Sequence, residues 1–389
     1  MIKLHPPKLS RTTLKSVNKV LKTNWLSTSG KNINKLETKL GKINNTKYCC
    51  ATINGTSALD LAIKSIKPNV DCEIITTSLS WISTVNAILY NDIKPIFLNI
   101  DNNFNLNLDD LEKFILNETY IRKNILYNKK TNKRIIAILY TNLYGNTLNI
   151  YKIKRILKKK GTKIFLIEDA AEVMGLKYKN KYCGSFGDIS ILSFYANKHI
   201  TTGEGGMVLT NNRKFKDKIF DYKNLCFGKK NRFNHYDIGW NYRYTNLQAS
   251  LGISQIRRIN KIILKKKEIG KKYYDNLKNC KNIYIQKPKL NNIENVYWVV
   301  GIVILNEKMT ATKFRNELKE YKIETREFFW PMNKQDALKK YNLRFKKNYK
   351  NSEYISKYGL YLPSGLGTSD KDINYVCKCV KKIKKRFNF

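Results

Sequence analysis

Residues 163–209 read KIFLIEDAAEVMGLKYKNKYCGSFGDISILSFYANKHITTGEGGMVL, and they contain two apolar runs that each lead to a reactive side chain. The first run, IFLI, ends in the carboxylates Glu168 and Asp169. The second run, Ile189–Phe194, is followed by Lys198 and a glycine-rich turn. Short apolar runs bounded in this way are typical of strands buried inside a sheet. The stretch therefore predicts two neighbouring strands with a carboxylate and a lysine at their ends.

A carboxylate and a lysine at the ends of neighbouring buried strands are what pyridoxal phosphate (PLP) chemistry requires. The lysine amine forms a Schiff base with the cofactor, and the carboxylate pairs with the pyridinium nitrogen so that the ring accepts electrons. The simpler interpretation is a strand that ends in an ordinary Asp169, with Lys198 a surface residue of a lysine-rich protein. Spacing alone leaves both interpretations open, because a motif is only a hypothesis about function.

The chain around this stretch alternates between predicted strands and helices. Strands are predicted at 49–53, 73–76, 95–100, 135–140, 163–167, 189–194 and 207–210, and helices at 10–22, 54–66, 81–90, 109–116 and 150–159. Such alternation is typical of an α/β fold with a mainly parallel sheet between layers of helices. Ligands of these sheets bind at the carboxyl ends of the strands. We therefore expect Asp169 and Lys198 to share one edge of the sheet.

The turn Gly55-Thr56-Ser57 lies on the same predicted edge and opens a helix. Free N–H groups and the helix dipole make such an N-terminus an anion site, and the two hydroxyls add donors. Thr56 and Ser57 could equally be plain N-caps. Their expected position beside Asp169 and Lys198 favours the phosphate-binding interpretation.

The pattern changes after Arg243. Residues 246–278 are predicted to form one long helix that leaves a large domain and enters a smaller one. Residues 296–305 read as a strand and 309–323 as a helix, and a last helix begins near Asp370. We therefore predict a large cofactor-binding domain at 1–250, which includes the N-terminal segment, and a small C-terminal α+β domain at 251–389.

Composition restricts the class of protein. The 389 residues include 74 Lys and Arg against 30 Asp and Glu, which gives a formal net charge of +44. A basic field attracts polyanions, but the lysines are spread over the whole chain and no nucleic-acid-binding motif accompanies them, so specific nucleic-acid binding is not expected. No apolar run is long enough for a membrane span, and MIKLHPPKLS lacks the core of a signal peptide. We expect a soluble, cytoplasmic protein without a metal site, because the eight cysteines show no zinc-type pairing.

The assembled motifs resemble the nucleotide-sugar aminotransferases of PLP fold type I, the DegT/StrS family, almost from end to end. The matching motifs are WLSTSG (25–30), NGTSALDLAI (54–63), SWISTVNAI (80–88), IEDAAE (167–172), GSFGDIS (184–190), SFYANKHITTGEGGMV (193–208), IGWNYRYTNLQA (238–249), IETREFFWPM (323–332) and LPSG (362–365). Within the family the sequence is most similar to perosamine synthases and related C4 aminotransferases. The resemblance implies the aspartate aminotransferase-like fold, PLP as cofactor, and a homodimer with shared active sites.

The resemblance also implies a role for individual residues. Lys198 matches the Schiff-base lysine and proton shuttle, and Asp169 the partner of the pyridinium nitrogen. The other cofactor positions are Glu172 near the ring hydroxyl, Trp81 stacked on the ring, Thr56, Ser57 and Ser193 at the phosphate, and Asn241 reaching the phosphate of the neighbouring subunit. Related dehydratases have histidine where this chain has Lys198, so lysine favours transamination. His199 is then expected to be structural or to support the site indirectly.

Substrate contacts are less well defined by the resemblance. Ser27 and Arg326 are candidate substrate contacts. Arg326 could contact a pyrophosphate, or it could form a structural salt bridge instead. Asn333 stands where many relatives have a histidine that faces the sugar or nucleotide, and an amide cannot titrate near neutral pH.

The expected reaction is transfer of the amino group of L-glutamate to C4 of a nucleotide-linked 4-keto-6-deoxyhexose, giving a perosamine- or viosamine-type sugar. A C3 aminotransferase and a non-catalytic sensor or regulator of PLP fold remain alternatives, and the nucleotide is left open among GDP, UDP and dTDP.

Overall fold

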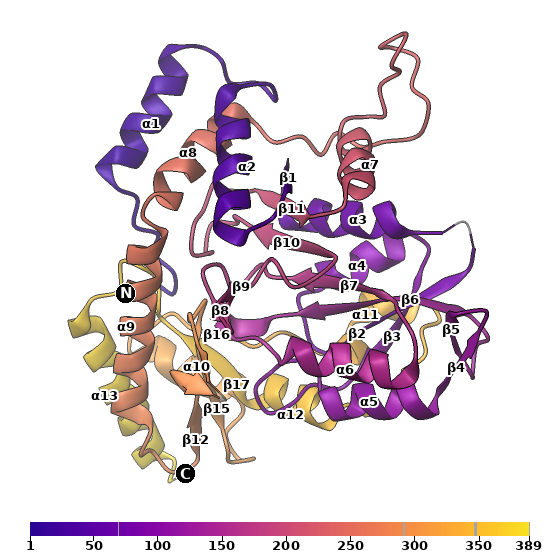
Figure 1. The fold of residues 1–389 in the computed structure, drawn as a ribbon. Coiled ribbons are helices and arrows are strands. Elements are labelled where there is room, and N and C mark those ends of the chain that lie inside the picture. The colour runs from indigo at the N-terminus through magenta and orange to yellow at the C-terminus, as the bar shows by residue number, and fades with distance from the viewer. Residues whose placement is uncertain (69, 291, 346–347, 389) are drawn as a thin grey trace.

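A central sheet with helices on both faces forms the larger part of the molecule (Figure 1). The computed structural model describes residues 1–389 apart from 69, 291, 346, 347 and 389. Within that part of the chain the sheet comprises β1 (Tyr48–Thr52), β2 (Cys72–Thr77), β3 (Lys94–Leu98), β4 (Thr119–Arg122), β5 (Ile125–Asn128), β6 (Arg134–Thr141), β7 (Phe165–Asp169), β10 (Ile189–Ser193) and β11 (Gly206–Thr210). The main strand order is β1-β11-β10-β7-β6-β2-β3.

The sheet is mainly parallel, as predicted. Strands β10, β7, β6, β2 and β3 run parallel to one another, whereas β11 is antiparallel to both of its neighbours. Successive residues of β10 point to opposite faces, so Ile191 packs into one hydrophobic core and Leu192 into the other. A sheet buried on both faces needs apolar residues at nearly every position, and this explains the continuous apolar runs in the sequence.

Two layers of helices cover these faces. The side of Ile191 is covered by α3 (Gly55–Ile66), α4 (Ser83–Tyr90) and α7 (Arg213–Lys223), and the side of Leu192 by α2 (Lys31–Asn44), α5 (Leu108–Asn117), α6 (Ile150–Lys160) and α8 (Asn246–Ile256). Helix α1 (Arg11–Lys22) packs against α8. None of the helices in the described residues is both long and apolar enough to cross a membrane.

The C-terminal part contains a second, antiparallel sheet with its own core. Its strands are β12 (Ile283–Ile285), β15 (Val300–Ile304), β17 (Gly359–Leu362) and β16 (Arg326–Glu327), in that order, and its helices are α9 (Ile259–Leu277), α10 (Ala311–Glu320), α12 (Lys350–Tyr358) and α13 (Asp370–Arg386). The short elements are η1 (Leu143–Gly145), β8 (Lys177–Tyr178), β9 (Lys181–Tyr182), β13 (Lys289–Leu290), β14 (Ile293–Glu294), η2 (Met332–Lys334) and α11 (Asp336–Lys339). The division at residue 250 stays a prediction.

The long helix predicted at 246–278 is wrong, because α8 ends at Ile256 and α9 begins at Ile259. Arg258 between them has φ −113° and ψ 10°, which is outside the helical region. Helix α8 packs against α1 and α2, whereas α9 packs against α13. Both helices need apolar stripes, so periodicity alone does not reveal that the packing partners change.

The strand predicted at 296–305 is also shorter than expected, since β15 begins only at Val300. Tyr297 adopts a left-handed conformation with φ 46°, and its N–H donates to the Asn295 side chain at 2.6 Å. These local bonds turn the chain before the strand starts, and this turn sets the position of Trp298 described below.

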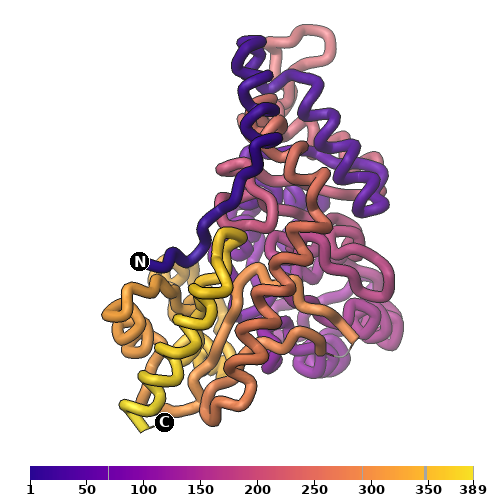
Figure 2. The backbone as a smooth tube through the Cα atoms, turned by 90° about the vertical axis from the view of Figure 1, so that its left-hand side faces the viewer, coloured from indigo at the N-terminus to yellow at the C-terminus, as the bar shows by residue number. Residues whose placement is uncertain are grey.

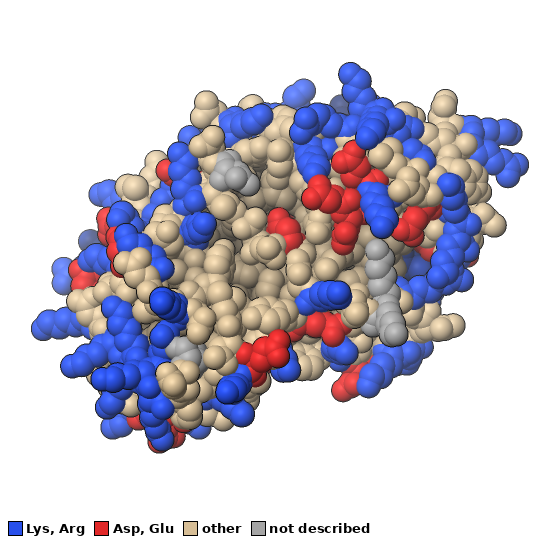
Figure 3. Space-filling model, turned by 90° about the horizontal axis from the view of Figure 1, so that it is seen from below, with Lys and Arg blue, Asp and Glu red and all other residues tan. Residues whose placement is uncertain are grey.

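The first residues of the chain lie against the C-terminal part (Figure 2). Ile2 forms a β-bridge with Ile323, and the N–H of Leu4 donates to the Glu324 carboxylate at 3.0 Å. Lysine and arginine side chains are distributed over the face shown in Figure 3, with a smaller group of acidic residues among them. On that face the charge forms no single basic stripe.

Candidate active site

Three of the predicted site residues, Asp169, Ser193 and Lys198, lie at or just beyond the carboxyl ends of β7 and β10. Asp169, the last residue of β7, lies opposite Thr141 on β6 and Ile191 on β10. Ser193 ends β10 two residues beyond Ile191, and the loop to β11 carries Lys198. The parallel register therefore brings residues from distant parts of the sequence to one edge, as expected for this fold class.

Three buried carboxylates occupy the end of β7 and the turn that follows it. Glu168 accepts hydrogen bonds from Phe186 N and Ser190 Oγ, both at 2.9 Å, and from Asn142 Nδ2 at 3.2 Å. Asp169 accepts from Ala171 N at 3.1 Å and from Thr84 Oγ1 at 3.3 Å. Glu172 accepts from Tyr144 N at 2.8 Å. Because buried polar groups are costly unless they are paired, these bonds hold the turn in one conformation.

Burial raises the pKa of all three carboxyl groups. For Asp169 the N–H of Ala171 and the charge of Lys198 oppose the effect of burial. For Glu172 burial raises the pKa to about 7, although the Lys198 charge and the Tyr144 N–H favour the ionised form. Glu172 can therefore gain or lose a proton near neutral pH, as a group that exchanges protons with a neighbouring amine must.

The amine of Lys198 lies between a carboxylate and an aromatic ring. Its Nζ is 3.4 Å from Glu172 Oε1, and both side chains are almost completely buried. On its other side Nζ lies 3.9 Å from the centre of the Trp298 ring. Lys198 is therefore not the solvent-exposed lysine of the simpler interpretation.

The start of α3 lies directly beside Ser193. A Cβ on Gly55 would be only 3.1 Å from the Ser193 Cβ, so the glycine permits the close approach of the two segments. Asn54 is the N-cap of α3, and its side chain accepts from Ser57 N at 2.8 Å and Ser57 Oγ at 3.0 Å. The alternative in which Thr56 or Ser57 is the plain N-cap is therefore wrong. The helix N-terminus and the Ser193 hydroxyl form one polar cradle.

Trp81 lies one turn before Thr84, the α4 residue that contacts Asp169. Its carbonyl accepts from Thr84 N at 3.1 Å, and the Thr84 hydroxyl donates to Asp169. The indole is 57% exposed and its ring centre lies 5.5 Å from that of Phe329. A large exposed ring beside a buried carboxylate offers a face on which a planar ligand can stack.

Comparison with known proteins assigns the chain to a family. Residues 7–381 match the model of the DegT/DnrJ/EryC1/StrS aminotransferase family. A GDP-perosamine synthase of Escherichia coli O157:H7 is 32% identical over 383 residues, which cover 98% of each chain.

The chain belongs to the DegT/DnrJ/EryC1/StrS aminotransferase family.

Solved structures support the same fold. The aminotransferase PseC of Helicobacter pylori, involved in the biosynthesis of pseudoaminic acid, has a TM-score of 0.87 at 24% identity and covers 99% of this chain and 100% of its own. A GDP-4-keto-6-deoxymannose-3-dehydratase with a trapped PLP–glutamate geminal diamine has a TM-score of 0.85 at 23% identity, covering 98% and 100%. The predicted PLP fold type I and the resemblance to DegT aminotransferases are confirmed, and the non-catalytic alternative loses its support.

In the described part of the chain, four other predicted residues share no hydrogen bond or ion pair with Asp169, Glu172 or Lys198. The exposed Asn241 accepts from Arg243 Nε at 2.9 Å, and the exposed Ser27 holds Asn246 N through its carbonyl at 2.8 Å. Arg326 is exposed opposite Tyr361, and its charge helps to lower the pKa of the half-buried His5 after the larger effects of burial and Lys266. Asn333 donates to Glu353 Oε1 at 2.7 Å.

His199 is buried and lies against the backbone, and its expected structural role stays a prediction. Its Nε2 lies 3.0 Å from Val296 O, the ring is 3% exposed, and burial lowers its pKa to about 3.

Sequence reasoning missed Trp298 and Tyr144, which contact Lys198 and Glu172. The apolar pattern at 296–305 predicts that Trp298 belongs to a strand, and no motif in the sequence points to Tyr144. A positive φ of 54° at the buried Tyr144 could not be recognised from residue type.

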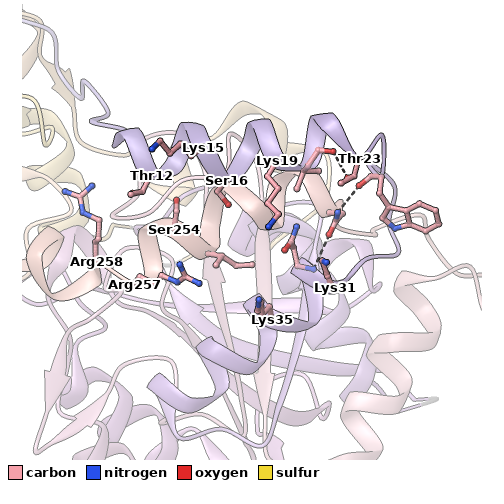
Figure 4. A pocket seen from close by; sticks show the side chains of 15 residues that line it. Thr12, Lys15, Ser16, Lys19, Thr23, Lys31, Lys35, Ser254, Arg257 and Arg258 are labelled. Carbon is pink, nitrogen blue, oxygen red and sulfur yellow. Dashed lines mark hydrogen bonds between the residues drawn. The ribbon is translucent and has the colours of Figure 1, made fainter.

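A groove of about 970 Å³ lies elsewhere, between α1, α2 and α8 (Figure 4). Its charged lining residues are Lys15, Lys19, Lys31, Lys35, Arg257 and Arg258. None of the predicted site residues lines it. The chemistry of the DegT family therefore points to the sheet edge rather than to this groove.

We predict that Glu172→Gln changes how stability depends on pH. The folded state raises the pKa of Glu172 to about 7, so it binds a proton more tightly than the unfolded chain does, and the wild type loses stability as pH rises from about 4.5 to 7. Glutamine cannot titrate and lacks this loss. Urea unfolding of the cofactor-free protein at pH 5 and pH 8 should show that the variant gains stability relative to wild type at the higher pH. An unchanged difference between the two proteins would show that Glu172 is ionised throughout.

Proposed function

We propose that the protein transfers the amino group of L-glutamate to C4 of a nucleotide-linked 4-keto-6-deoxyhexose. The product is a 4-amino-4,6-dideoxy sugar nucleotide of perosamine or viosamine type. The buried Lys198–Glu172 pair beside Asp169, on a DegT-family fold, carries the proposal. The GDP-perosamine synthase that matches nearly the whole chain supports the sugar class.

The residues at the sheet edge fit PLP. Asp169 presents a buried carboxylate for the ring nitrogen, Trp81 an exposed ring for stacking, and Glu172 a group for the ring hydroxyl. Thr56, Ser57 and Ser193 surround the cradle at the start of α3, where the helix dipole favours a phosphate. When bound, the cofactor supplies an aldehyde that takes up the amino group and a ring that holds the electrons released at the carbon.

In this proposal Lys198 and Glu172 hold the cofactor and transfer protons at the reacting carbon. The amine of Lys198 anchors the cofactor covalently and, when it is free, moves a proton to or from the reacting carbon. The Glu172 carboxylate 3.4 Å away keeps that amine in place and can exchange a proton with it near neutral pH. Ser27, Arg326 and Asn333 are proposed contacts of the nucleotide sugar, with Asn333 already tied to Glu353.

The direct test is an assay with PLP, glutamate and a panel of 3-keto and 4-keto sugars linked to GDP, UDP or dTDP. Mass spectrometry and NMR should show an amine at C4 of one 4-keto sugar together with 2-oxoglutarate. Lys198→Ala should abolish product, because no other amine of the described residues forms an ion pair with Glu172. Lys198→Arg is the matched control: it keeps the charge but not the nucleophile and should be equally inactive. An amine at C3 supports the C3 alternative, and full activity of Lys198→Ala contradicts the assignment.

We also propose a homodimer in which Asn241 reaches the phosphate of the partner's cofactor. The segment between α7 and α8 projects from the body of the molecule (Figure 1), and its Phe233 and Ile238 are 81% and 83% exposed. Exposed apolar side chains of this size favour contact with a protein partner. Asn241 lies at the end of this segment, where it forms a β-bridge with Asn224.

Subunit mixing tests the shared site. Chains with Lys198→Ala and chains with Asn241→Ala should each be weakly active or inactive alone. After unfolding and refolding together in equal amounts they should recover about a quarter of wild-type activity, since a mixed dimer contains one site with both native residues. The mixture would stay inactive if each chain built its site alone.

A further inference from the structure

Trp298 makes the second contact to the Lys198 amine, and nothing in the proposed reaction assigns it a role. The Lys198 Nζ lies 3.9 Å from the ring centre, which is within the range of a cation–π contact. The indole is 4% exposed, so water does not screen this contact. The ring and the Glu172 carboxylate together restrict the amine to one small volume.

Trp298 is in turn held by hydrogen bonds through both its indole ring and its backbone carbonyl. Its indole N–H donates to Asn197 O, the carbonyl next to Lys198, at 3.1 Å. Its own carbonyl accepts a hydrogen bond from Lys266 Nζ at 3.1 Å. The ring lies parallel to that of Tyr144, at an interplanar angle of 2°, and Tyr144 is the residue whose N–H holds Glu172. The two groups that face Lys198 are therefore joined to each other.

Lys266 on α9, which holds the Trp298 carbonyl, is a buried lysine with an unusual set of partners. Its side chain is 4% exposed and donates to the carbonyls of Trp298 and Ser364, and no carboxylate of the described residues forms an ion pair with it. A buried amine with only carbonyl partners costs free energy, in agreement with the fall of its pKa to about 7. Its two hydrogen bonds tie α9 to the segment before β15 and to the LPSG segment, and so support Trp298.

We propose that Trp298 is a positioning residue for the Lys198 amine and that Lys266 fixes Trp298 in that position. While the amine is free, the ring face and the Glu172 carboxylate keep it beside Asp169, so that it meets the cofactor aldehyde in one orientation. A loss of orientation at a reacting group slows a reaction even when the group itself is unchanged. The proposal rests on the role proposed for Lys198.

Phenylalanine and leucine at position 298 separate this role from simple packing. Both are smaller than tryptophan and of similar size to each other, but only phenylalanine offers a ring face to the amine. Rapid mixing of the cofactor-free protein with PLP should give about tenfold slower appearance of the lysine-bound absorbance band for Trp298→Leu, and at most about a threefold change for Trp298→Phe. Lys266→Met should slow the reaction in the same direction. Equal rates for the Phe and Leu variants would overturn the proposal.

A second measurement needs no cofactor. The cofactor-free proteins are treated with a small amine-acetylating reagent, and the modification of Lys198 is followed by peptide mass spectrometry. Acetylation of Lys198 should accelerate in Trp298→Leu, where one face of the amine is uncovered, and stay near the wild-type rate in Trp298→Phe. If the Leu variant does not fold, Trp298→Met replaces it as the variant without a ring. No difference between ring-bearing and ringless variants would contradict the proposal.

Two control variants complete the design. Lys223→Met removes another buried lysine, which donates to Ala51 O at 2.9 Å, and Tyr358→Leu removes a buried ring from the same hydrophobic cluster as Trp298. Neither residue contacts Lys198, so both variants should leave the rates of PLP binding and of Lys198 acetylation unchanged. If the controls changed these rates as much as Trp298→Leu does, general destabilisation would explain the effect, and the proposal would be overturned. Wild-type protein that fails to bind PLP at Lys198 contradicts the proposed function instead, while the acetylation result still decides the role of Trp298.

Discussion

Burial of three carboxylates at the end of β7 is the constraint on which the site depends. Each carboxylate is expensive to bury, and each is satisfied by a different part of the chain: Glu168 by the segment before β10, Asp169 by α4, and Glu172 by η1 and Lys198. Meeting these requirements together fixes four segments around one strand end. The geometry of the site is thus a consequence of satisfying buried charge.

The same arrangement links the C-terminal part to the chemistry. Trp298 at the approach to β15 covers Lys198, and Tyr144 in η1 lies parallel to Trp298 while its N–H holds Glu172. The carbonyl of Gly145 accepts from Val296 N at 2.9 Å, so the two segments are also joined through their backbones. The site is built from both parts of the fold, although most of the predicted cofactor residues belong to the central sheet and its loops.

Sequence reasoning succeeded where a physical rule is local. Apolar runs that end in Asp169 and before Lys198 indicate buried strands, and the parallel arrangement follows from the alternation with helices. It failed where the deciding contact is distant in sequence. The break between α8 and α9 depends on which helix each one packs against, and the position of Trp298 depends on the left-handed Tyr297. The family resemblance supplied Trp81 and Asn241, whose roles no spacing rule could indicate.

The central claim is that Lys198, among the many lysines of this chain, is the one that binds the cofactor. It is tested most directly by loading the protein with PLP, reducing it with borohydride and mapping the labelled peptides by mass spectrometry. We predict a phosphopyridoxyl group on Lys198, because among the described residues this amine alone forms an ion pair with Glu172, and its charge acts on Asp169. A label on another lysine, or one spread over surface lysines with Lys198 unmodified, would contradict it.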